Sequence, residues 1–190
     1  MKNEEAIRII AGKLQIPLEF LESAQLDFTQ KTLKKGESIA RIGEKCLEIS
    51  YVQSGVLYKS LCTSDGKEVT TDIISSGGFA SPYSDQIMDR ASSLNIKTLT
   101  KSTLICVSFN EIRLLSLNHP SWMRVILGIT EGLYVEKIER ERFFLALSAK
   151  EKIDYFFKMN KDLIGIIPKN IIASYLGINP STFSRLYQKD

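Results

Sequence analysis

The chain has 190 residues, 44% hydrophobic and 25% charged, with 25 Lys and Arg against 22 Asp and Glu. This composition is typical of a globular protein with a substantial core and excludes intrinsic disorder. One His and three widely spaced Cys exclude a multi-histidine metal site and a CxxC metal or redox site. There is no apolar run long enough to cross a bilayer and no secretory pattern, so we expect a cytoplasmic protein without a membrane partner.

The net charge of +3 is unevenly distributed along the chain. Residues 1–147 hold 18 basic and 18 acidic residues, whereas residues 148–190 hold seven basic and four acidic residues. The whole surplus therefore lies in the last 43 residues. An excess of this kind at one end is a weak indication of a polyanion partner.

The first 27 residues are expected to form short helical pieces. Ala6, Ile7, Ile10 and Leu14 fall at helical spacing, and Ile16-Pro17 interrupts the pattern. From Phe28 onward, short stretches rich in β-branched residues alternate with glycines, which predicts an antiparallel sandwich or barrel. The candidate strands are Phe28–Leu33, Glu48–Gln53, Val56–Leu61, Val69–Ile74, Leu94–Thr100 and Leu104–Ser108. Asp65-Gly66 between two of them predicts a tight two-residue hairpin turn.

After Phe109 the pattern becomes helical. A short helix is expected over residues 110–118, ended by His119-Pro120, and a long helix over about residues 121–147. The long helix has two apolar stripes, formed by Trp122, Ile126, Ile129 and Leu133 and by Leu127, Tyr134, Ile138 and Leu145. We expect one stripe to pack on its own domain and the other on a second copy of the chain. The alternative is a long helix buried within a single subunit.

Residues 168–188 carry the most specific pattern in the chain. Pro168 suits the first turn of a helix, and Gly177 can end that helix in the left-handed conformation. Asn179 is a good N-cap for a second helix, which Phe183 would anchor from its inner face. With Ala173 as a small contact residue, this spacing predicts a helix-turn-helix, and an ordinary helical hairpin is the alternative.

The second of these helices would enter the DNA major groove with its N-terminal residues toward the base edges. Arg185 can make a bidentate contact with guanine, and Ser181, Thr182 and Ser184 can reach bases or phosphates. Lys169, Gln188 and Lys189 are placed for phosphate contacts. Double-stranded DNA is therefore the expected partner.

A glycine-rich β domain, a long helix and a terminal helix-turn-helix together resemble the Crp/Fnr family of transcription regulators. The resemblance rests on the segments Lys35-Gly36-Glu37, Gly43-Glu44, Tyr51-Val52-Gln53-Ser54-Gly55, Asp65-Gly66-Lys67, Ile96-Lys97-Thr98-Leu99, Ile172-Ala173-Ser174-Tyr175-Leu176-Gly177-Ile178 and Thr182-Phe183-Ser184-Arg185. The last segment resembles versions common in Bacteroidetes-type members. The resemblance implies an α+β chain: a cyclic-nucleotide-binding-like antiparallel jelly roll over residues 1–120, a dimerisation helix over 121–147 and a DNA-binding domain over 148–190. It also implies a homodimer on a palindromic site, with RNA polymerase as a further partner.

The ligand site departs from the family pattern, in which a Glu binds the ribose and an Arg ten residues later binds the cyclic phosphate. In the family pattern a Phe stands three residues before the Glu. Aligning Phe79 with this Phe takes the alignment through Ser81 and places Pro82 at the Glu position and Ser92 at the Arg position. Only the hydroxyl group that follows the Arg is kept, in Ser93. Arg90 could rebuild an anion site only if the loop were rearranged. Loss of a charge-assisted phosphate contact costs several kcal/mol, so we expect no cofactor and no usual response to cAMP. Calorimetry showing micromolar binding of cAMP would refute this expectation.

The sequence therefore predicts a homodimeric DNA-binding regulator, not an enzyme, whose effector is unknown or absent. The alternative is a small-molecule-binding signalling protein whose C-terminal helices bind another protein. The polar outer face of the second helix argues against that alternative, because protein-binding faces are more apolar. A cupin-like enzyme would also have a jelly roll, but its chemistry needs several His around a metal.

Overall fold

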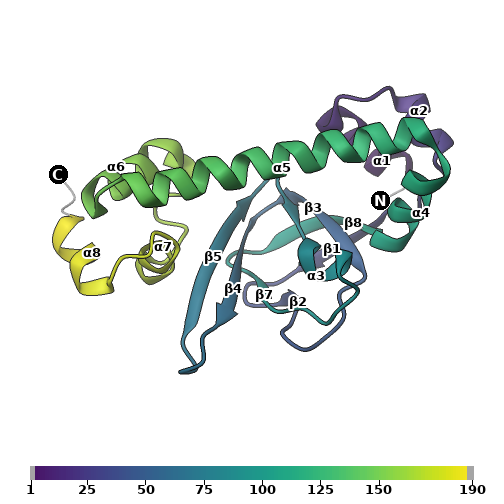
Figure 1. Ribbon diagram of the computed structural model, residues 1–190. Helices are drawn as coiled ribbons and strands as arrows, with labels where there is room; N and C mark the ends of the chain where they lie inside the picture. Colours follow the sequence, from purple (N-terminus) through teal and green to yellow (C-terminus); the bar gives the residue numbers. More distant parts are fainter. Residues whose placement is uncertain (1–2, 188–190) are drawn as a thin grey trace.

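The computed structural model describes residues 3–187, and it begins with two helices, α1 (Asn3–Leu14) and α2 (Leu18–Ser23) (Figure 1). Ala6, Ile7 and Ile10 on α1 are buried, as their helical spacing predicted. The chain leaves α1 just before Pro17, so the predicted interruption is confirmed. These helices pack beside the β domain at the end opposite to the C-terminal helices.

Eight antiparallel strands form two four-stranded sheets, ordered β1-β8-β3-β6 and β2-β7-β4-β5. The strands are β1 (Thr29–Leu33), β2 (Ser38–Ala40), β3 (Glu48–Ser54), β4 (Val56–Cys62), β5 (Glu68–Ser75), β6 (Phe79–Ala80), β7 (Asn95–Thr98) and β8 (Ser102–Ser108). All six predicted strands are confirmed. Sequence periodicity missed β2 and β6, because three and two residues are too few to show an alternation.

The core of the sandwich lies between the two sheets and contains the fully buried Val52, Leu57, Ile96 and Leu104. Gly55 joins β3 to β4 at a φ of +100°, and a Cβ there would lie 2.2 Å from Ser102 Oγ. Both the backbone conformation and the lack of space therefore require glycine at this turn.

The hairpin between β4 and β5 exists, but its turn is longer than predicted. The Thr63 N–H donates to the Lys67 carbonyl at 2.9 Å, and the residues between them form the loop. Gly66 takes the left-handed conformation with a φ of +82°. The prediction of a two-residue turn was wrong, because Asp-Gly dipeptides also occur in three-residue loops that end on a left-handed glycine.

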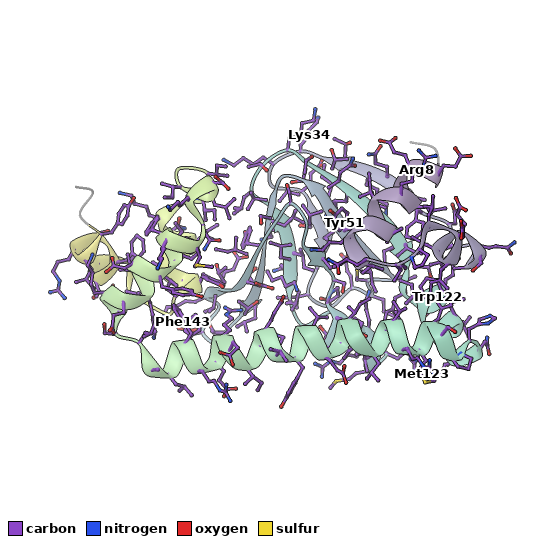
Figure 2. All side chains as sticks on the ribbon, turned by 90° about the horizontal axis from the view of Figure 1, so that it is seen from above. Arg8, Lys34, Tyr51, Trp122, Met123 and Phe143 are labelled. Carbon is purple, nitrogen blue, oxygen red and sulfur yellow. The ribbon has the colours of Figure 1, made fainter. Side chains whose placement is uncertain are left out.

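A short helix, α3 (Tyr83–Ile87), lies between β6 and β7, and two further helices, α4 (Phe109–Asn118) and α5 (Pro120–Ala146), connect β8 to the C-terminal region. The 27 residues of α5 span about 40 Å, and the helix runs across the whole molecule (Figure 1). Trp122 points from α5 toward the rest of the chain, whereas Met123 points away from it (Figure 2). The helix therefore has one covered side and one open side. Among the described residues, no helix combines the length and the apolar character needed to cross a lipid bilayer.

The C-terminal region consists of α6 (Ala149–Met159), a 3₁₀ turn (Lys161–Leu163), α7 (Lys169–Tyr175) and α8 (Pro180–Leu186). A capping box opens α6: the Ser148 side chain accepts from the Glu151 N–H, and Glu151 accepts from the Ser148 N–H. Ile153, Phe156 and Leu176 are buried in the small core of this region. That core is continuous with Val56 and Leu99 of the β domain.

Candidate functional site

The turn between α7 and α8 has the hydrogen bonds of a Schellman motif. The Ile178 N–H donates to the Ala173 carbonyl at 2.9 Å, and the Gly177 N–H donates to the Ser174 carbonyl at 3.0 Å. Gly177 has a φ of +65°, which lets it end α7 in the left-handed conformation. Ile178 is buried beneath the turn. The termination of α7 at Gly177 is thus confirmed in its geometry.

The start of α8 follows from two local residues. Asn179 Oδ1 accepts from the Ser181 N–H at 2.9 Å and from the Ser181 hydroxyl at 2.7 Å. Pro180 is the first helical residue, where its missing N–H removes no helical hydrogen bond. Phe183 is 1% exposed and fixes the inner face of α8 against the other helices. Together, α7, the turn and α8 form a helix-turn-helix.

The outer face of α8 is polar. Ser181, Ser184 and Arg185 are exposed, and Thr182 is half-buried. Of the apolar residues of α8, only Pro180 at its first position is exposed, since Phe183 is buried and Leu186 is half-buried. This face can offer hydroxyl groups and one guanidinium, which are donors suited to base edges and phosphates.

Tyr187 is half-buried and packs against the core of this region. Its ring stacks on Phe157 at 4.6 Å and on Phe183 at 5.6 Å, measured between ring centroids. Lys169 Nζ lies 4.9 Å from the centroid of the same ring, so the aromatic ring holds the lysine on the surface near α8. The predicted contact residues Gln188 and Lys189 lie outside the described residues.

The C-terminal region is attached to the β domain along β5. The Thr70 N–H donates to Ser174 Oγ at 2.9 Å, which joins β5 to α7. Arg140 of α5 lies over the ring of Tyr175, 4.4 Å from its centroid, and 4.0 Å from Asp72 Oδ1 on β5. Burial raises the pKa of Tyr175, so this hydroxyl stays neutral beside Arg140. These contacts connect α5, α7 and β5 at one point.

Sequence reasoning missed Arg140. The highly charged segment from Glu136 to Arg142 indicates a solvated helix face, and part of it is one, since Arg142 pairs with Glu139 at 2.7 Å. Arg140 differs because its position on α5 turns it toward the C-terminal region. Its sequence context carries no signal for this role, because the aromatic and acidic partners come from distant segments.

The candidate ligand residues lie around a different side chain from the one expected. Asp85 of α3 is buried, and its Oδ1 accepts from Arg90 Nε at 2.6 Å. Its Oδ2 accepts from both the N–H and the hydroxyl of Ser93 at 2.8 Å. Burial alone would raise the pKa of Asp85, but the hydrogen bonds from Ser93 and Arg90 outweigh it and lower that pKa below its usual range. Asp85 is therefore held as a carboxylate.

Donors at this loop already hold an internal anion. The donors of Ser93 and the Nε of Arg90 already bind an anion, which is the carboxylate of Asp85. Ser92 faces elsewhere and donates its hydroxyl to the Leu94 carbonyl at 2.7 Å. The structure thus does not gather the five predicted ligand residues in one pocket: Phe79 and Ser81 line a separate apolar cavity.

No known family profile and no curated protein matches this sequence significantly. Solved structures do match. FixK2 from Bradyrhizobium japonicum has a TM-score of 0.71 at 16% identity, over 85% of this chain and 83% of its own. A protein assigned to the Crp/Fnr family of transcriptional regulators, from Eubacterium rectale, has a TM-score of 0.70 at 15% identity, over 84% and 76%. The c-di-GMP-responsive global regulator CLP from Xanthomonas campestris has a TM-score of 0.62 at 17% identity, over 93% and 89%. With two antiparallel sheets, a long helix and a C-terminal helix-turn-helix, this chain has the fold of the Crp/Fnr transcription regulators.

Proposed function

We propose that this chain is a DNA-binding transcription regulator that acts as a homodimer on a two-fold symmetric site. The observation that carries the proposal is the helix α8, whose buried Phe183 orients an exposed face of Ser181, Ser184 and Arg185. The alternative, a protein-binding role for the C-terminal helices, fits this polar face poorly.

The charge of the C-terminal region supports a nucleic-acid partner. Its described part, residues 148–187, holds six basic residues and three acidic residues. One acid, Asp154, pairs with Lys150 at 2.8 Å, and another, Glu151, caps α6. A surplus of this size supports modest attraction to phosphates, so one subunit alone should bind DNA weakly.

The open side of α5 supports dimerisation. Leu127, Tyr134 and Leu145 are 55%, 66% and 81% exposed, although all three are apolar or aromatic. With the half-buried Ile138, they follow one another at intervals of seven, four and seven residues, so they fall on seam positions of a heptad repeat, whose two intervening seam positions are Glu131 and Glu141. The first stripe, from Trp122 to Leu133, lines the apolar cavity on the other side of the helix. A second α5 is the partner that fits the open stripe.

The effector of such a regulator would not be a cyclic nucleotide bound in the usual way. Asp85 supplies an internal anion to Arg90 and Ser93, where a phosphate would meet a carboxylate of like charge. The proposed regulator therefore either works without a nucleotide or responds to another class of molecule.

In vitro selection of duplexes from a random pool tests the proposal. A two-fold symmetric site should be enriched, with half-sites about one helical turn apart, and its binding should weaken steeply as the salt concentration rises. If the pool stayed random after several rounds and the amount of duplex that the protein retains did not depend on salt, the result would count against DNA binding and favour the protein-binding alternative.

Replacing Arg185 by alanine is expected to weaken binding to the selected site by about 1–3 kcal/mol and to relax its sequence preference. The reason is that Arg185 is the exposed guanidinium of α8 and can bind a guanine edge bidentately. Fluorescence anisotropy on specific and scrambled duplexes measures both effects. Lys158→Ala is the matched control. This exposed lysine lies on α6, so its loss should weaken binding to all DNA sequences alike. Unchanged specific binding by Arg185→Ala would show that α8 is not the recognition helix.

A further inference from the structure

An apolar cavity of about 290 Å³ lies between α5 and the outer face of the sheet β1-β8-β3-β6. Alternation along the strands creates this second face: Leu104 of β8 packs between the sheets, whereas Ile105 and Val107 point the other way and line the cavity. Tyr51 of β3 lines it as well. This volume is close to the lower end of the range of small-molecule sites, which is about 300–1,000 Å³.

The cavity is elongated along α5. The helix contributes Trp122, Val125, Ile126, Ile129 and Leu133 to its wall. The first and last of these are eleven residues apart, which corresponds to about 16 Å along the helix axis. Sequence periodicity identified this stripe as a packing face, but its side chains enclose space instead of filling it completely.

The charges around the cavity are of one sign. Among its lining residues within 3–187 there is no Asp or Glu, whereas Lys59 and Arg113 both contribute. Lys59 is paired with Asp72 at 3.5 Å, so its charge is already partly compensated. Arg113 lies on α4 and is exposed, which leaves its guanidinium able to meet a ligand at the wall. An apolar body with an anionic head group would complement these walls.

We propose that this cavity binds an elongated, largely apolar carboxylic acid, with its tail beneath α5 and its carboxylate at Arg113. The cluster of Asp85, Arg90 and Ser93 is separate, since none of these three residues lines the cavity. The ligand would touch α5, the helix that connects the β domain to the C-terminal region. The proposal concerns the β domain and α5 and does not depend on DNA binding.

Trp122 provides a direct readout, because it is the only tryptophan of the chain and lines the cavity. We expect titration of the full chain with decanoic acid, below its micelle concentration, to change Trp122 fluorescence saturably and to release heat in calorimetry. Decan-1-ol, which has the same tail without the charge, should bind about tenfold more weakly. If decanoic acid at millimolar concentration changed neither the Trp122 fluorescence nor the heat released in calorimetry, the proposal would be overturned.

Two variants separate the head group from the tail. Arg113→Gln should weaken the binding of decanoic acid about tenfold and leave the binding of decan-1-ol unchanged. Arg124 is an exposed arginine of α5 outside the cavity, so Arg124→Gln should change neither affinity. Ile129→Phe fills the cavity and should abolish binding of both, with circular dichroism to establish that the variant folds. If Arg113→Gln left both affinities unchanged, the assignment of the carboxylate to Arg113 would be wrong, whether or not Ile129→Phe folds.

Discussion

Replacing Phe183 by alanine is expected to lower the free energy of unfolding by about 3–5 kcal/mol, the usual cost of truncating a buried aromatic ring to alanine. Phe183 is 1% exposed and lies in the core that holds α8 against α6 and α7. It also stacks on Tyr187, with ring centroids 5.6 Å apart. Its loss leaves a cavity that a region of three short helices can fill only by moving α8.

Phe183→Ala should lower the affinity for DNA by more than the replacement of any single proposed contact residue does. Because the angle of α8 depends on Phe183, its truncation displaces Ser181, Ser184 and Arg185 together. We expect specific affinity in anisotropy to fall by more than the Arg185→Ala variant loses. Trp122 lies at the opposite end of α5, so its fluorescence reports separately on the β domain during denaturation.

Met159→Ala is the matched control for Phe183→Ala. Met159 belongs to the same region but is 61% exposed, so its truncation should change the free energy of unfolding by less than about 0.5 kcal/mol. If Phe183→Ala were as stable as this control and bound DNA normally, Phe183 would not position α8, the proposed recognition helix.

Replacing Asp85 by alanine is expected to lower the free energy of unfolding by about 1.5–3 kcal/mol at neutral pH. The carboxylate accepts hydrogen bonds from Arg90 Nε, the Ser93 N–H and the Ser93 hydroxyl, and all three lose their acceptor. Arg90 is 54% exposed and can be rehydrated, which keeps the cost below that of isolating a buried charge. Urea unfolding of the two proteins measures the difference.

The pH dependence of this difference identifies the carboxylate as its source. The folded protein lowers the pKa of Asp85, so its contribution is fully present above the unfolded pKa of about 3.9. It is lost as the pH falls through the lower pKa of the folded state. The stability gap between the wild type and Asp85→Ala should therefore be constant from neutral pH down to about pH 5 and shrink below about pH 4.

Asp89→Asn is the control for Asp85→Ala. Asp89 pairs with Lys45 at 2.8 Å, but its side chain is 83% exposed, and such surface pairs contribute about 0–1 kcal/mol. A stability gap for Asp85→Ala no larger than this control, or one independent of pH down to pH 2, would contradict the role of Asp85 as an internal anion.

The predictable parts of this chain are those whose conformation depends on neighbouring residues. Gly177, Asn179 and Pro180 determine where α7 ends and α8 begins, because left-handed backbone, capping oxygens and missing N–H groups act within one helical turn. His119-Pro120 separates α4 from α5 for the same reason. The Asp65-Gly66 turn was predicted with the wrong length, because several loop types accept that dipeptide.

Asp85 shows what the sequence could not indicate about the candidate ligand site. The prediction that Pro82 and Ser92 stand where the Crp/Fnr pattern has Glu and Arg needs only a count along the sequence from Phe79. The substitute was not readable from the sequence, because Asp85 is one carboxylate among many until the fold brings Ser93 and Arg90 to it. Arg140 is a similar case, since Tyr175 and Asp72 reach it from segments 35 and 68 residues away.

The sequence by itself determined the order of the elements, the two-sheet β domain, the long helix and the helix-turn-helix with its polar outer face. These follow from period, turn chemistry and capping, which act over a few residues. Only the tertiary structure decided which anion Ser93 and Arg90 bind, how α7 is attached to β5 and where α5 encloses a cavity instead of a filled core. Such features depend on side chains that are distant in sequence, and their packing is specified by the register of strands and the angle of helices.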